Sequence, residues 1–265
     1  MQPAISLRDY NILVELSGSL KSEKGDVMSQ DANTFAPQEY TLADRASVDA
    51  RASFIVKTYT HLLGAVLALI AIDAVLLQLP IAQRLTETLF GSGYMWLFAI
   101  GAFMVVSHVA NRWAHNAASV QMQYMGLGLY VIAQAIILLP LLYVAANYGG
   151  QDVIPTAGIV TLCAFTGLTA VVVLTRKNFS FLGPFLGVAG FVALGFIVCA
   201  IVFGFSLGML FTVLMIGFAC GYILYYTSKV MHEYHIGQHV AASLALFSAV
   251  ALLFWYILQF VMGRN

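Results

Sequence analysis

Residues 180–227 read SFLGPFLGVAGFVALGFIVCAIVFGFSLGMLFTVLMIGFACGYILYYT and contain no charged side chain. A helix needs about 20 mainly apolar residues to cross the hydrocarbon core of a bilayer, so this stretch is long enough for two crossings. We predict spans at 180–204 and 207–227, joined by a short turn. The hydrophobicity is continuous rather than alternating, which excludes a closed β-barrel.

The rest of the chain follows the same pattern. Of its 265 residues, 61% are hydrophobic and 9% are charged, against roughly 45–50% and 25% in soluble domains. The charges of twelve basic and twelve acidic residues cancel, so the chain lacks the excess of basic residues that is typical of nucleic-acid binding. We therefore predict an all-α, polytopic membrane helix bundle with seven transmembrane helices, the other five lying at 55–79, 93–112, 122–146, 153–175 and 239–262.

A polar segment precedes the first span. Residues 1–53 hold thirteen of the twenty-four charged residues, with a net charge of −3. They lack the basic start and apolar run of a secretory signal peptide, and their composition is typical of a disordered segment. We predict a disordered cytoplasmic tail at 1–53, either a solvated leader or a partner-binding segment, and a seven-helix domain at 54–265.

Basic residues in short loops predict the orientation, because they favour the cytoplasmic side of a membrane. With the N-terminus inside, only Arg84 and Arg264 flank the outer side. We therefore predict a cytoplasmic N-terminus and an outside C-terminus, in the inner membrane if the source is bacterial. The residues that flank the inner side are Arg45, Arg51, Lys57, Arg112, Arg176, Lys177 and Lys229.

Two polar residues inside the spans are candidates for an ion path, because burying polar groups in a membrane is costly. Asp73 lies toward the outer end of the first span. One interpretation is a cation site in an outer vestibule. The other, which we favour, is an interfacial cap or hydrogen-bond partner. Gln134 lies near the middle of the third span, one turn after Tyr130. Its amide lines a pore or bonds a neighbouring helix, and the second role is more typical.

Three histidines near the inner side form a second candidate site. The spacing of His232, His235 and His239 would place them on one helical face. A structural role is the ordinary interpretation; the alternative is a cytoplasmic pH sensor, since histidine titrates near neutrality. The spacing does not match a zinc-protease helix, and we expect no metal and no cofactor. The sequence has no nucleophile elbow or phosphate-binding loop, so we expect no enzyme.

Four motifs, in this order, resemble the Bax inhibitor-1 family of seven-helix membrane proteins. They are FIVKTY at 54–59, HLLG at 61–64, the basic turn and helix start TRKNFSFLG at 175–183, and GYILYYTS at 221–228. The resemblance covers about residues 50–262. It assigns Arg176 and Lys177 to a cytoplasmic basic turn.

The resemblance implies a protein linked to stress or cell-death suppression. It also implies a pH-sensitive calcium leak, which in the family is attributed to two facing aspartates that share a proton. Tyr226 and Ala249 stand at those two positions here, and Asn178 stands where the basic turn often has an acidic residue. The proton-gated mechanism therefore cannot be carried over, although Tyr226 remains a candidate gate.

Two functions remain open. The favoured one is a stress-related regulator or interaction protein that binds other membrane proteins through the bilayer or its acidic tail. The alternative is a calcium leak channel or transporter whose gating is altered by the loss of the aspartate pair.

Overall fold

The computed structural model describes residues 41–116 and 119–264. Seven of their helices are long and apolar enough to cross a membrane, which confirms the predicted fold class. They are α2 (Val48–Leu76), α4 (Gly93–Ala114), α5 (Val120–Tyr148), α6 (Val153–Thr175), α7 (Leu182–Phe203), α8 (Gly208–His232) and α9 (His239–Met262). The predicted disordered tail lies largely outside the described residues, and its last part, 48–53, begins α2.

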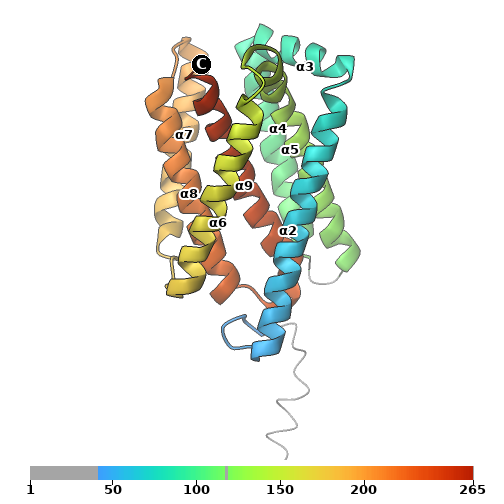
Figure 1. The fold of residues 1–265 in the computed structure, drawn as a ribbon, viewed down its shortest axis with the longest axis vertical. Helices are drawn as coiled ribbons and strands as arrows, with labels where there is room; N and C mark the ends of the chain where they lie inside the picture. Colours follow the sequence, from blue (N-terminus) through green and yellow to red (C-terminus); the bar gives the residue numbers. More distant parts are fainter. Residues whose placement is uncertain (1–40, 117–118, 265) are drawn as a thin grey trace, which may run out of the picture. The chain divides into compact units, whose positions relative to one another are not determined.

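Helix α9 is the centre of the bundle. It packs against α2, α4, α5, α6 and α8, and Figure 1 shows α2 and α6 in front of it. Fifteen of its residues are buried, which is possible because its sequence is apolar on all sides. Helix α5 is the other strongly buried span, whereas few residues of α4 and α7 are buried.

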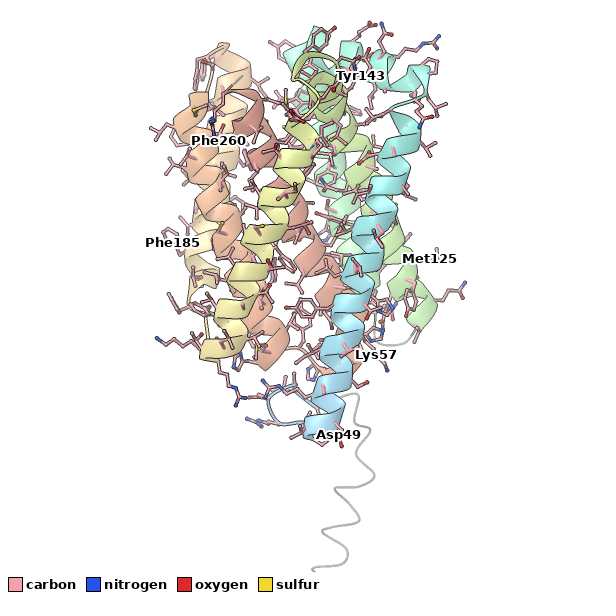
Figure 2. The ribbon with its side chains drawn as sticks, viewed as in Figure 1. Asp49, Lys57, Met125, Tyr143, Phe185 and Phe260 are labelled. Carbon is pink, nitrogen blue, oxygen red and sulfur yellow. The ribbon has the colours of Figure 1, made fainter. Side chains whose placement is uncertain are left out.

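The helix ends form two groups. We call the basic end the part of the bundle containing residues 41–57, 111–116, 119–120, 175–181 and 229–239, and the far end the part containing 77–93, 146–153, 203–208 and 260–264. Figure 2 shows Asp49 and Lys57 toward the basic end and Tyr143 and Phe260 toward the far end. All seven basic residues that we assigned to the inner side lie at the basic end.

A short helix at the far end was not predicted. Helix α3 (Pro80–Gly91) begins with proline at its first position, where the missing N–H costs no hydrogen bond. It buries Ala82, Thr86 and Leu89, spaced four and three residues apart, so one face packs against α4 and α5. Its twelve residues are too short to span a bilayer, so it leaves the number of crossings at seven.

Two helix crossings depend on glycine. A Cβ atom at Gly126 of α5 would lie 2.6 Å from the carbonyl oxygen of Ala110 on α4. A Cβ atom at Gly183 of α7 would lie 2.9 Å from the ring of Tyr225 on α8. These close approaches are how membrane helices pack when apolar burial gives no driving force between them.

The chain entering α2 is tied to the connection between α8 and α9. Ala43 donates its backbone N–H to the carbonyl of Tyr234 (2.9 Å), and Ile236 donates to the carbonyl of Thr41 (3.1 Å). Leu42 and His235 thereby form an isolated antiparallel bridge. The segment before the first span is thus held against the loop before the last one.

Candidate functional site

The candidate ion-path residues lie in three different places. Asp73 lines a cleft between α2 and α6, Gln134 lines a cavity among α4, α5, α7, α8 and α9, and Tyr226 lies near the basic end of α8. The structure therefore does not bring these three side chains together.

The Gln134 cavity has a volume of about 800 Å³. It extends from the far end, at Phe205 and Gly263, to the middle of the bundle, at Tyr130 and Gln134. Tyr130 is 7% exposed and Gln134 is 6% exposed. Most of the wall is apolar and aromatic, as in sites that bind apolar ligands.

Aromatic rings close the inner end of this cavity. The ring of Tyr130 lies 5.8 Å from that of Phe103 and 5.9 Å, edge to face, from that of Phe247. Phe247 is fully buried and does not line the cavity. The cavity thus ends on a packed aromatic layer rather than on charged groups.

Position 226 is part of a tyrosine cluster. The Tyr226 ring stacks on Tyr222 with centroids 5.5 Å apart, and it lies 5.1 Å from the Tyr225 ring. The Lys229 ammonium lies 5.4 Å from the centroid of Tyr225, within cation–π range. Ala249, at the second position of the family's acidic pair, is buried in the main core. Rings and a methyl group therefore occupy the two positions where the resemblance places carboxylates.

Asp73 continues the buried stripe of α2. The stripe runs through Thr58, Leu62, Ala65 and Leu69 at helical spacing, so the carboxylate faces α9 rather than the lipid. Asp73 is 3% exposed, and its Oδ1 has no hydrogen-bond partner among the described residues. Among those residues, the structure therefore shows neither a helix cap made by the Asp73 side chain nor a hydrogen bond of its Oδ1 that would explain the buried position.

The prediction that three histidines share a helical face is wrong. Helix α8 ends at His232, His235 precedes a short 3₁₀ turn, and His239 begins α9. The helix ends there because the chain turns to pair with residues 41–43. His239 instead lies beside His61 of α2, with ring centroids 5.0 Å apart. Among the residues the structure describes, no cluster of three potential ligands could hold a metal.

His61 connects α2, α5 and α9 close to the basic end. Its Nδ1 lies 2.6 Å from the carbonyl oxygen of Lys57, and its Nε2 lies 2.9 Å from the hydroxyl of Tyr124 on α5. A neutral ring satisfies both contacts if Nδ1 donates and Nε2 accepts. The sequence spacing could not reveal this site, because its members lie on separate helices.

Tyr234 lies beside the Lys229–Glu233 ion pair (3.6 Å). Burial, with smaller effects from Tyr226, Tyr225 and Glu233, raises the pKa of Tyr234 above its ordinary value. Its phenol is therefore neutral at physiological pH. The loop after α8 thus carries the neutral phenol of Tyr234 beside the Lys229–Glu233 ion pair.

The basic turn is held in place by hydrogen bonds of its uncharged side chains, not by its two cations. Asn178 Oδ1 accepts from the Ser180 amide (2.8 Å) and from the hydroxyl of Ser228 on α8 (3.3 Å). Ser180 also donates to Glu233. Arg176 and Lys177 are exposed and form no ion pair with another described residue. The side-chain amide of Asn178 thus anchors the turn, and the two cations beside it are exposed at the surface.

The fold and these positions define a class: a seven-helix membrane protein with tyrosine at its core near the basic end. The family described as inhibitor of apoptosis-promoting Bax1 matches residues 51–265. The chain belongs to this family, which confirms the resemblance. Over 111 residues it is 33% identical to an uncharacterized protein of Pseudomonas aeruginosa, an alignment covering 42% of this chain and 50% of that protein. The chain thus spans about half the length of the curated relative it matches. No solved structure matches it.

Proposed function

We propose that this protein is a stress-related regulator that acts by binding other membrane proteins, rather than a proton-gated cation leak or an enzyme. The observation that carries the proposal is the replacement of the family's carboxylate pair by Tyr226 and Ala249. A titrating pair needs two carboxylates in one dry site. The acidic residues of the segment 54–265 are Asp73, Glu87, Asp152 and Glu233, and none of them stands at position 226 or 249.

The basic end supplies a surface for such a partner. Arg176 and Lys177 are exposed on a turn that hydrogen bonds fix to α8. Fixed cations favour association with an acidic surface, because complementary charge speeds encounter and sets orientation. We propose that this turn, together with the acidic tail at 1–53, contributes to partner recognition.

Crosslinking in native membranes tests this role. We expect at least one membrane protein to be captured by the wild-type chain and lost from a variant with Arg176→Glu and Lys177→Glu. Arg264→Glu, which changes an exposed cation at the far end, is the matched control and should retain the partner. If a captured partner depends on neither the basic turn nor residues 1–53, the proposed surface is wrong.

The orientation is part of the proposal. The asymmetry of basic residues supports a cytoplasmic basic end and an outside C-terminus, and the inner membrane is the expected location in a bacterium. A reporter fused after Asn265 should be active only on the outer side. Activity confined to the cytoplasm would overturn the orientation.

A second function is favoured by the 800 Å³ cavity, which extends to Gln134 in the middle of the bundle. If the aromatic layer of Phe103, Tyr130 and Phe247 opens, the cavity would form the part of a cation path between the far end and the middle of the bundle. Calcium is the first ion to test. Liposomes containing the full chain and a calcium dye separate the two functions. We expect no flux above that of protein-free liposomes at acidic or neutral pH, and flux at either would favour the channel.

A further inference from the structure

Helices α2 and α6 form the walls of a cleft that does not belong to the cavity above. Both pack against α9, but they have almost no contact with each other, so α9 forms the floor between them. The cleft has a volume of about 280 Å³. Ile70 of α2 and Leu162 of α6 line it and are each 58% exposed, so its mouth faces the hydrocarbon phase of the membrane.

Asp73 is the one charged residue in this lining. Thr161 is the other polar residue, and its hydroxyl donates to the carbonyl of Ala157 at 2.7 Å. Thr161 therefore has no hydrogen left for the carboxylate. No lysine, arginine or histidine lines the cleft. The carboxylate thus lacks both a donor and a counter-charge, which is costly in a low-dielectric site.

The chemistry of the missing partner follows from the lining. A calcium ion takes six to eight oxygen ligands, and the cleft offers one carboxylate and one hydroxyl. An organic ammonium supplies both the positive charge and the N–H donors that Asp73 lacks. Its apolar portion would contact the leucine, isoleucine, valine and phenylalanine side chains that form the rest of the lining.

We propose that this cleft binds an amphiphilic amine from the membrane, with the ammonium on the Asp73 carboxylate and the apolar body between α2 and α6. The cleft volume of about 280 Å³ lies just below the range of small-molecule sites, about 300–1,000 Å³. It therefore suits one alkyl chain or a small ring system rather than the two acyl chains of a phospholipid. The amine enters from the lipid phase, past Ile70 and Leu162.

Photolabelling in liposomes tests the proposal on the full chain. The probe is dodecylamine carrying a diazirine on its chain, in phosphatidylcholine vesicles. We expect labelled peptides from α2 and α6, and we expect unlabelled dodecylamine to compete while 1-dodecanol at the same concentration does not. Competition by dodecanol as strong as by the amine would overturn the role of charge.

Variants locate the site. Asp73→Asn keeps the size of the side chain and removes its charge, so labelling should fall at least tenfold. Asp152→Asn removes an exposed carboxylate at the same end of the bundle and should leave labelling unchanged. Equal labelling of wild type and Asp73→Asn would refute the proposal.

A third variant tests the cleft with Asp73 in place. A Cβ atom at Gly158 meets nothing within 4 Å, so Gly158→Leu can fill the cleft without a backbone clash and should also abolish labelling. If Gly158→Leu does not fold, Asp73→Asn alone decides. Loss of labelling when phosphatidylethanolamine is added would identify a phospholipid with two acyl chains as the occupant and overturn the proposal of a single-chain amine.

Discussion

Asp73 and Tyr226 have opposite surroundings in the bundle: the first lines an open cleft and the second is packed against other rings. Asp73 places a carboxylate in an open apolar cleft, without a hydrogen bond to Oδ1, whereas Tyr226 fills a position of the family's carboxylate pair with a ring stacked on Tyr222. The first site has room, and its Oδ1 has no hydrogen-bond partner among residues 41–116 and 119–264; the second site is packed. The difference indicates that this chain keeps its one intramembrane carboxylate for something that enters from the membrane, and keeps the helix contact near the basic end closed.

Removing the ring at 226 should have the largest effect on stability. Tyr226→Ala leaves a hole in the tyrosine cluster, and we expect it to lower the free energy of unfolding by about 2–3 kcal/mol. Tyr226→Phe keeps the stacked ring and should change it by less than about 1 kcal/mol. Reversible unfolding in detergent measures both. If the two variants behave alike, the ring packing described here does not hold α8 in place.

At Asp73 the expected change has the opposite sign. Asp73→Asn removes a buried carboxyl group that has no counter-ion in the lining of the cleft, so we expect the free energy of unfolding to rise by about 1–2 kcal/mol. The same unfolding measurement, made without added amine, checks it. Asp152→Asn is the control and should unfold like the wild type. A clear destabilisation by Asp73→Asn would mean that the carboxylate has a partner within the protein.

A smaller effect is expected where α7 supports the tyrosine cluster. Gly183→Ala forces the Tyr225 ring to move, because the new Cβ would lie 2.9 Å from it, and we expect a loss of about 1 kcal/mol. Gly187 is one turn further along α7 and has open space. Gly187→Ala should therefore be neutral or slightly stabilising, since alanine favours helix. Unfolding midpoints of the pair give the comparison.

The smallest effect is local. Asn178→Ala removes the acceptor for Ser180 and Ser228, at a cost of about 0.5–1 kcal/mol. We expect faster hydrogen exchange at the amides of residues 179 and 180, with the rest of α7 unchanged. Lys177→Ala, which removes an exposed neighbouring side chain, should leave this exchange as it is. Unchanged exchange in Asn178→Ala would show that the hydrogen bonds do not anchor the turn.

The seven spans could be predicted because apolar length alone specifies a membrane helix. The spans 153–175 and 239–262 match α6 and α9 to the residue. Helix α2 begins earlier than predicted, at Val48, where Ser47 caps the first turn by accepting from the Ala50 amide (3.4 Å). A Ser-Val-Asp sequence before an apolar run is a helix-start pattern that could have indicated this boundary.

The sites were less accessible from sequence, because they depend on contacts between distant segments. The break between His232 and His239 comes from pairing with residues 41–43, which no local spacing reveals. The buried position of Asp73 follows from its helical stripe. The cleft, however, exists because α2 and α6 both pack on α9 with almost no contact between them. Helix α3 could have been found from Pro80 and the spacing of its buried residues, yet its weak hydrophobicity hid it.

The central claim is that Tyr226 and Ala249 remove the titrating pair that gates a calcium leak. Calcium flux into dye-loaded liposomes, compared between the wild type and a variant with Tyr226→Asp and Ala249→Asp, tests it most directly. The account predicts no flux for the wild type at acidic or neutral pH, and a flux that changes with pH only in the double variant. A wild-type flux that changes with pH would contradict it.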